Sequence, residues 1–280
     1  MSVDEQVGCF LDEDRILIHA IAEVRSAISQ AVELIATGLN AGGRLVYIGA
    51  GTSGRLGVLD ASECPPTFGV EPTLVCGLMA GGETALLKAV EGAEDDVAAG
   101  GADLSNIGFA PPDVVVGITA SGTTPYVKGG LAHARALGAK TILVACNPSR
   151  PGFSEVDVLI NPVTGPELIT GSTRLKAGTA TKMILNMLSS ISMIRIGKVY
   201  ENLMVDVQAT NAKLRKRACR IVMTGGSVDE AQAEKLLEAA DGEAKTAICM
   251  ARRGMAAIDA RHAIAEAGGF LYKAIGEEHD

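Results

Sequence analysis

Five short runs of apolar and β-branched residues recur along the chain, and their recurrence is what most constrains the fold. The runs cover residues 45–48, 73–78, 113–118, 141–146 and 156–160. Helical patterns separate them, and strands that alternate with helices form a parallel sheet. Residues 125–137 are one such pattern, ended by Gly138 and long enough for a right-handed crossover. We therefore predict an α/β fold with a doubly wound, parallel, five-stranded sheet.

The strand signal disappears after Pro166, and the rest of the chain is typical of helices. Residues 172–196 predict one long apolar helix that is covered on several faces. From residue 225 a new pattern begins, with Ser227 as the expected N-cap and Glu230 completing a capping box. Further helices are expected over 244–252 and 256–266. We predict two domains: residues 1–224, which hold the sheet and flanking helices, and residues 225–280, a C-terminal three-helix module.

Composition excludes several classes of function. Net charge is −8 and only 3% of residues are aromatic, which argues against a nucleic-acid partner. The longest apolar run, residues 183–194, is interrupted by Asn186 and falls short of the roughly 18 residues that a membrane span needs. The acidic N-terminus does not look like a signal peptide. Six scattered cysteines without metal-ligand spacing predict reduced thiols, a cytoplasmic protein and no metal site.

A glycine-rich loop follows the first predicted strand. Gly49, Gly51 and Gly54 match the pattern G-x-G-x-x-G, so a dinucleotide site is one interpretation. That interpretation needs an acidic residue roughly 20 positions further on, at the end of the second strand. Here the second strand ends in Cys76-Gly77-Leu78, which weighs against a dinucleotide.

Hydroxyl side chains follow both the first and the third predicted strand. The carboxyl ends of parallel strands meet at one sheet edge, where open α/β sheets bind their ligands. Hydroxyls and the amides of a helix N-terminus hold a phosphate monoester without Lys or Arg, which suits an acidic protein that binds a sugar phosphate. The alternative is that these residues only cap the following helices. The candidate residues are Thr52, Ser53, Thr119, Ser121, Thr123 and Thr124.

Both loops resemble those of the sugar isomerase (SIS) domain family, which binds phosphosugars. More specifically, the chain resembles the N-acetylmuramic acid 6-phosphate etherase family from about residue 11 to residue 275. The resemblance implies cleavage of the D-lactyl ether of N-acetylmuramic acid 6-phosphate, in amino-sugar catabolism and cell-wall recycling, without a cofactor. It also implies a homodimer. The motifs that carry it lie at residues 49–69, 91–94 and 171–179.

By this resemblance, Glu63 is the proton donor and Glu94 is the second catalytic carboxylate. The sequence adds a physical reason for the first role. Pro65-Pro66 is expected to end the preceding helix, so Glu63 would face the negative helix pole, with Asp60 one turn earlier. Both effects favour the protonated acid that a proton donor needs. Glu94 lies in an acidic stretch, and its alternative interpretation is a solvated acidic face.

The segment at residues 165–176 resembles the glucokinase regulatory protein as well, so it marks the wider fold. Within it, Ser172, Arg174 and Lys176 are expected to approach the ligand, where a cation would match the lactyl carboxylate. The alternative is that this segment caps the long helix. Cys64, beside Glu63, has no histidine partner in the sequence, so we reject thiol catalysis.

Two other functions use the same loops. One is a non-catalytic phosphosugar-binding regulator; the other is an aldose–ketose phosphosugar isomerase, which shares proton abstraction at C2 but needs no acid at a C3 ether. Etherase family members also carry a longer segment before the stretch equivalent to residues 11–15. If that segment closes the site, this chain is expected to be weakened or inactive.

Overall fold

The computed structural model describes residues 1–147, 155–207 and 212–277. The chain forms two compact units. Unit 1 comprises Met1–Ser62 and Pro72–Ser192, and unit 2 comprises Glu63–Glu71 and Met193–Asp280. Each unit is described by itself below.

Unit 1 is built on the predicted sheet. All pairings are parallel and the strand order is β2-β1-β3-β4-β5, which confirms the doubly wound prediction. The chain passes from β1 to β2 on one side and then returns to β3 on the other side of β1. The switch point of the sheet therefore lies between β1 and β3. The strands are β1 (Leu45–Gly49), β2 (Val75–Met79), β3 (Val114–Ile118), β4 (Lys140–Val144) and β5 (Val158–Ile160).

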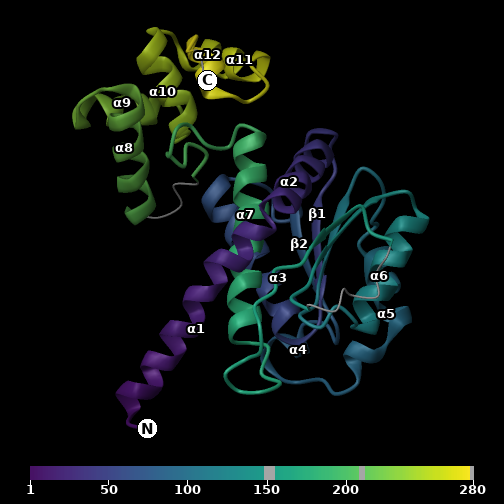
Figure 1. Cartoon of the computed structure of the whole chain (residues 1–280). Helices are drawn as coiled ribbons and strands as arrows, with labels where there is room; N and C mark the ends of the chain where they lie inside the picture. The colour runs from purple at the N-terminus through teal and green to yellow at the C-terminus, as the bar shows by residue number, and fades with distance from the viewer. Residues whose placement is uncertain (148–154, 208–211, 278–280) are drawn as a thin grey trace. The chain divides into compact units, whose positions relative to one another are not determined.

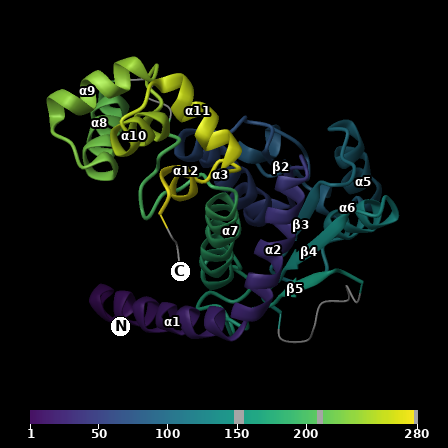
Figure 2. The same ribbon diagram turned by 90° about the horizontal axis from the view of Figure 1, so that it is seen from above.

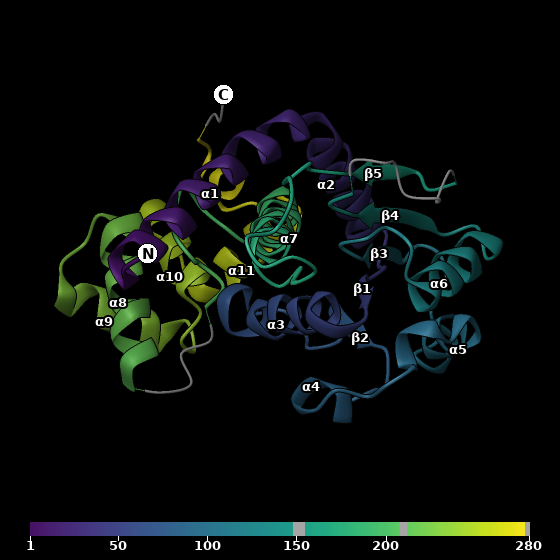
Figure 3. The same ribbon diagram turned by 60° about the horizontal axis from the view of Figure 1, so that its bottom comes forward.

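Helices cover both faces of the sheet (Figures 1, 2 and 3). On one face lie α2 (Arg25–Asn40), α3 (Gly51–Phe68) and α7 (Lys176–Arg195); on the other lie α5 (Val97–Asn106) and α6 (Pro125–Ala136). Adjacent residues of β1 face opposite layers, as the pleat requires. A Cβ on Gly57 of α3 would lie 2.9 Å from Tyr47 Cβ, and one on Gly130 of α6 would lie 2.4 Å from Ile48 Cδ1. Both faces are thus closely packed.

The predicted long helix is α7, which begins at Lys176 rather than at residue 172. Its apolar side chains Ile184, Leu185 and Leu188 are buried, as expected, whereas Ile191 and Ile194 near its C-terminal end are 37% and 46% exposed. In the part of the chain that the structure describes, no helix combines the length and the apolar character that crossing a membrane requires.

The predicted end of α3 at Pro65-Pro66 is wrong. The helix continues through both prolines to Phe68, and Gly69 N donates to Pro65 O at 2.9 Å. Proline lacks the N–H that would bond to the residue four positions earlier, but its fixed φ is compatible with a helix. Two missing hydrogen bonds near a helix end therefore did not stop it. Glu63 lies before the last turn and not at the helix end.

The long helix α1 and two short elements complete the described part of unit 1. Helix α1 (Val3–Glu23) precedes α2 and buries only residues near its C-terminal end, namely Leu17, Ala20 and Ile21. Between β2 and α5, the chain forms α4 (Thr84–Leu87) and the 3₁₀ helix η1 (Ala93–Asp95). The 3₁₀ helix η1 carries Glu94 and Asp95 of the predicted acidic stretch.

Among its described residues, unit 2 holds helices α8 to α12, which share an apolar core. They are α8 (Ala212–Gly226), α9 (Glu230–Ala239), α10 (Ala244–Arg253), α11 (Ala257–Glu266) and α12 (Leu271–Ile275). The helices expected near 244–252 and 256–266 are confirmed by α10 and α11. Helix α8 runs through residue 225, and an independent domain that begins there stays a prediction. Ser227 as N-cap is wrong: Asp229 caps α9, accepting from Gln232 N at 2.8 Å.

A buried lysine joins three segments of unit 2. Lys245 Nζ donates to Asp206 Oδ2 at 2.7 Å, to Gly197 O at 2.8 Å and to Gly269 O at 3.2 Å. Burial lowers the pKa of Lys245, and the Asp206 carboxylate partly offsets that effect. Since an uncompensated buried charge is costly, this set of partners fixes the loops before α8 and before α12 to α10.

Candidate functional site

The loop after β1 turns the chain directly into α3. Only Ala50 separates the end of β1 at Gly49 from the start of α3 at Gly51. A Cβ on Gly49 would lie 2.8 Å from Gly54 N, so this tight turn needs glycine. Thr52 and Ser53 lie half-buried in the first helical turn. The first amides of a helix have no intrahelical acceptor, and together with these hydroxyls they suit an anion.

The loop after β3 gathers four hydroxyl groups. Thr119 Oγ1 lies 2.7 Å from Thr124 Oγ1 and 3.3 Å from Ser121 Oγ, which lies 2.9 Å from Thr123 Oγ1. Thr124 precedes α6 but makes no side-chain capping bond to it. The capping alternative is therefore wrong for this loop. Because hydroxyls rotate and both donate and accept, this cluster has the donors that phosphate oxygens need.

A cavity of about 180 Å³ lies at this edge of the sheet. Its lining residues follow three neighbouring strands and reach the start of α7. Asn147, directly after the predicted fourth strand, donates from Nδ2 to Ser121 O at 2.7 Å. The sequence analysis missed Asn147, although its place at a strand's carboxyl end could have indicated it. The lining residues are Ala120, Ser121, Cys146, Asn147, Thr164, Gly165, Glu167, Thr173 and Ala177.

The start of α7 is held by side chains of unit 1. Glu167 caps the helix: its Oε2 accepts from Lys176 N at 2.9 Å and its Oε1 from Ala177 N at 3.0 Å. Lys176 is 1% exposed, and its Nζ lies 2.5 Å from Glu13 Oε2. Ser172 is half-buried and Arg174 exposed. The capping alternative thus holds through Glu167, while ligand contacts by Ser172, Arg174 and Lys176 stay predictions.

The structure brings the loop after β1 close to the start of α7. A Cβ on Gly178 would lie 3.7 Å from Thr52 Cγ2 and 3.5 Å from Thr173 O. Gly178 therefore leaves room next to Thr52. Thr173 also lines the cavity beside Ser121. One edge of unit 1 thus holds the loops after β1 and β3 and the start of α7.

The two predicted catalytic carboxylates are both exposed. Glu63 lies on α3 in unit 2, and Glu94 lies on η1 in unit 1, so their pairing stays a prediction. Asp60, which precedes Glu63 by one turn, is buried: its Oδ2 accepts from Tyr47 OH at 2.8 Å and its Oδ1 from Asn186 Nδ2 at 2.7 Å. Within the acidic stretch, Asp96 caps α5 by accepting from Ala98 N and Ala99 N.

The thiols near these loops are poorly suited to nucleophilic chemistry. The pKa of Cys146, which lines the cavity, is raised to about 11, mainly by burial and to a smaller extent by the Glu167 carboxylate, while a hydrogen bond with Thr181 opposes both. A thiol with this pKa is protonated near pH 7, and the thiolate is the reactive form. Cys64 is buried. These observations support the rejection of thiol catalysis.

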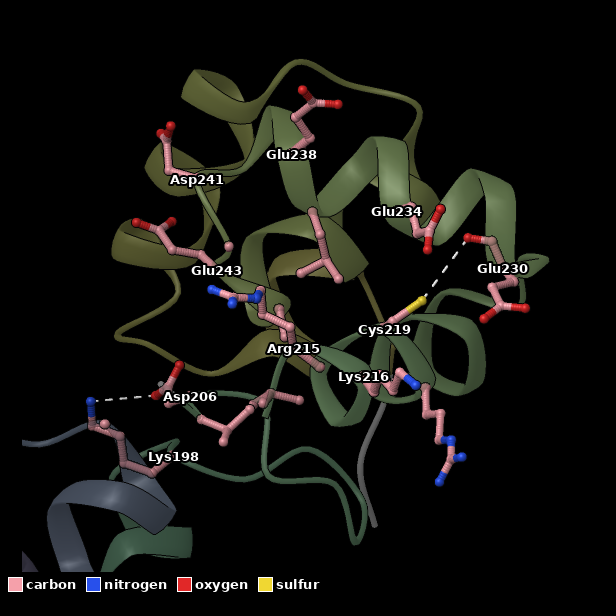
Figure 4. Close-up of a pocket in the computed structure, with 18 residues that line it drawn as sticks. Lys198, Asp206, Arg215, Lys216, Cys219, Glu230, Glu234, Glu238, Asp241 and Glu243 are labelled. Carbon is pink, nitrogen blue, oxygen red and sulfur yellow. Dashed lines mark hydrogen bonds and ion pairs between the residues drawn. The ribbon is translucent and has the colours of Figure 1, made fainter. Parts of the chain in front are cut away.

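Unit 2 contains a larger cavity, of about 1100 Å³ (Figure 4). Basic side chains of α8, including Arg215 and Lys216, and carboxylates of α9 line it. Cys219, Glu230 and Glu234 place potential metal-ligand atoms within 4.8 Å of one another. However, burial raises the pKa of Cys219, and the carboxylates of Glu234 and Glu230 raise it further. A metal binds the thiolate and would have to displace this proton, and the expected absence of a metal site stays a prediction.

Comparisons with known proteins identify the class first. The family model "Glucokinase regulatory protein N-terminal SIS domain" matches residues 27–135. A phosphoheptose isomerase from Francisella tularensis superposes with a TM-score of 0.54 at 19% identity, covering 69% of this chain and 100% of its own. One from Neisseria gonorrhoeae gives 0.51 at 20%, covering 68% and 100%. The fold is that of a SIS domain, as predicted.

Closely related sequences identify the family. An N-acetylmuramic acid 6-phosphate etherase from Serratia proteamaculans is 57% identical over 275 residues, which are 98% of this chain and 93% of the relative. One from Yersinia pestis is 56% identical with the same coverage. The chain belongs to the N-acetylmuramic acid 6-phosphate etherase family, which consists of lyases. The predicted family is confirmed.

Proposed function

We propose that this protein cleaves the D-lactyl ether of N-acetylmuramic acid 6-phosphate, giving N-acetylglucosamine 6-phosphate and D-lactate. The observation that carries the proposal is the 57% identity to an etherase over 98% of the chain. The sheet edge supports it, because it offers hydroxyls and helix amides where a SIS fold binds its ligand. We propose that the reaction belongs to amino-sugar catabolism and cell-wall recycling.

The chemistry proceeds by elimination and hydration. An ether is a poor leaving group, so the reaction uses the open-chain aldehyde, which acidifies the proton at C2. Glu94 removes this proton as the C3–O bond breaks, and Glu63 protonates the departing lactate oxygen. Water then adds at C3 of the unsaturated aldehyde, and a proton returns to C2. The sum is one substrate and one water converted into two products, with no redox change.

The hydroxyl-bearing loops position the substrate for this sequence. Thr52 and Ser53 at the start of α3, and Ser121, Thr123 and Thr124 after β3, bind the phosphate. Thr119 is buried beneath them and orients Thr124 through the 2.7 Å contact between their hydroxyl oxygens. Phosphate binding thereby supplies energy for placing C2 and C3 against the carboxylates.

The test is D-lactate release from N-acetylmuramic acid 6-phosphate by the purified protein and by Glu63→Gln. We expect the variant to lose about 10²- to 10⁴-fold in kcat, because it keeps the shape of the acid but loses its proton. Phosphosugar binding should persist. Glu71→Gln, an exposed glutamate nearby in the sequence, is the control and should retain activity.

The outcomes separate the rival functions. Full activity in Glu63→Gln would contradict the assignment of the acid. Saturable binding without lactate release by the unaltered protein would indicate a regulator, and an interconverted aldose and ketose would indicate an isomerase.

We also propose that the protein is a homodimer that pairs through α1. Four apolar residues lie on one side of this helix and are exposed: Val3 by 77%, Val7 by 51%, Phe10 by 40% and Leu11 by 57%. The N-terminal part of α1 extends away from the sheet (Figures 1 and 3). Sedimentation velocity should give a dimer for the unaltered protein and a monomer for Phe10→Glu. A monomeric unaltered protein would contradict this proposal.

A cytoplasmic location is proposed on the state of the cysteines. None of the six cysteines, all of which lie in the described part of the chain, forms a disulfide. Free thiols are typical of reducing compartments. Cell fractionation with a periplasmic marker would test the location, and recovery with that marker would contradict it.

A further inference from the structure

Arg55 connects the glycine-rich loop to the segment that carries Glu94. It is the fifth residue of α3 and directly follows Thr52, Ser53 and Gly54. Its Nη2 donates to Ala85 O at 2.7 Å, and its Nε donates to Leu86 O at 3.0 Å. Both acceptors belong to α4, in the chain between β2 and α5. All of these residues are in unit 1.

The end of α4 needs such a partner. This helix has only four residues, and the last carbonyls of a helix receive no hydrogen bond from an N–H group of the same helix. A guanidinium presents several donors in one plane, so it can bind two neighbouring carbonyls at once. Arg55 therefore closes the C-terminal end of α4 with donors at Nε and Nη2, and a lysine, which has a carbon atom where Arg55 has Nε, would not reproduce this planar pair.

The segment between β2 and α5 buries few side chains among its described residues. Ala85 is the buried residue of α4, whereas Leu87 is 91% exposed, and η1 has no buried residue. Ala93 packs against the core cluster that includes residues of α6. A Cβ on Gly81 would contact Val90, Ala85 and Ala93 at 3.0, 3.2 and 3.3 Å. The segment is therefore a small folded turn in which Ala85 of α4 and Ala93 of η1 both lie next to Gly81.

We propose that Arg55 is a positioning residue that sets the place of Glu94 relative to the phosphate-binding start of α3. The inference rests on the proposed function, in which Glu94 abstracts the C2 proton. Arg55 fixes Ala85 to α3; Ala85 and Ala93 meet at Gly81; and Glu94 directly follows Ala93. The same helix turn that binds the phosphate thus sets the distance from phosphate to base.

The experiment compares Arg55→Lys and Arg55→Ala with the unaltered protein in two measurements. Amide hydrogen exchange should become at least about tenfold faster in residues 82–95 because two hydrogen bonds are lost, and it should not change in α6. For lactate release, kcat should fall about 10²-fold, as for a misplaced catalytic group, while KM changes less than about threefold. Added guanidinium should partly restore kcat in Arg55→Ala but not in Arg55→Lys, whose side chain still occupies the space.

Arg135→Lys is the matched control, since Arg135 on α6 is half-exposed and pairs with Glu155 at the surface. It should leave both measurements unchanged. Unchanged exchange in residues 82–95 of the Arg55 variants would overturn the proposal, as would faster exchange with an unaltered kcat. An unaltered protein that releases no lactate would refute the proposed function instead, and the exchange data would still decide whether Arg55 holds the segment.

Discussion

The sheet of unit 1 has one side where its parallel strands begin, here called the amino edge, and one side where they end, the carboxyl edge. The side chains at these two edges interact in different ways. At the amino edge, charged groups are paired across strands: Arg44 before β1 binds Asp113 before β3, with Nη2 to Oδ2 at 2.6 Å. Lys140 and Thr141 of β4 bind Asp157 before β5. At the carboxyl edge, neutral hydroxyls contact one another around Ser121 and Thr119.

This difference separates stability from binding. The Arg44 guanidinium also donates to Ile107 O and Gly108 O. Its donors are therefore engaged by acceptors of the protein itself. The hydroxyls at the carboxyl edge bond mainly to one another, and Thr123 N also donates to Ser121 Oγ at 3.2 Å. Each can rotate toward a ligand without leaving a buried charge unpaired. An acidic protein can thereby bind a phosphate at one end of a sheet that ion pairs stabilise at the other.

The largest effect is expected at the amino edge. Asp113→Ala should lower the free energy of unfolding by about 3–5 kcal/mol, because it leaves Arg44 partly buried without its carboxylate. Asp113→Asn, which keeps an acceptor for Arg44 N, should cost less. Urea unfolding measures both, and phosphosugar affinity of the folded fraction should not change.

Asp12→Ala is the control for this comparison. Asp12 pairs with Arg15 at 2.7 Å, but the two side chains are 70% and 78% exposed. Exposed pairs contribute little, so the change should stay within about 0.5 kcal/mol. Equal losses for Asp113→Ala and Asp12→Ala would show that the amino edge does not depend on its buried pair.

At the carboxyl edge the expected effect is on binding. Ser121→Ala should weaken phosphosugar affinity about 10- to 100-fold, the cost of losing one hydrogen bond to a charged group. The free energy of unfolding should change by less than about 1 kcal/mol, because Ser121 is exposed. Calorimetric titration and urea unfolding give the two values.

Ser105→Ala is the matched control, because this hydroxyl on α5 also bonds within the protein, to Gly101 O at 3.0 Å. It should not affect affinity. A large stability loss with unchanged affinity in Ser121→Ala would reverse the roles that we assign to the two edges.

The sequence predicts the strands and the loops that follow them, but not the contacts between side chains at the two edges. The apolar runs and the intervening helical patterns predicted all five strands, because each element is encoded locally. The loops at the switch point follow from strand order. By contrast, Arg55 reaches α4 across 30 positions of sequence, and Glu167 caps a helix that begins nine residues later. Such pairs depend on tertiary packing.

The wrong prediction at Pro65-Pro66 has a similar origin. Proline removes a local hydrogen bond, which favours ending a helix, but it does not forbid the helical backbone angle. The Asp60 carboxylate between Tyr47 and Asn186 ties the preceding turn of α3 to β1 and α7. A local rule could not include these bonds, so the helix extends further than the sequence indicated.

The smallest effect concerns the second charged pair of the amino edge and its dependence on pH. Burial alone would raise the pKa of Asp157, but hydrogen bonds from Lys140 and Thr141 lower it below its ordinary value. A carboxyl with a lowered pKa in the folded state stabilises the protein above its unfolded pKa of about 4. This contribution is lost as the pH falls through the folded pKa.

We expect Asp157→Asn to cost about 1 kcal/mol near pH 7, the typical net value of such bonds at a partly exposed site. The difference from the unaltered protein should begin to shrink below about pH 4 and should disappear once the pH is below the folded pKa of Asp157, where the aspartic acid is as neutral as the asparagine. Urea unfolding between pH 7 and pH 3 measures it, with the exposed Asp259→Asn as control. A difference that stays constant with pH would mean that the Asp157 charge does not contribute, and that the amino edge depends on Arg44 and Asp113 alone.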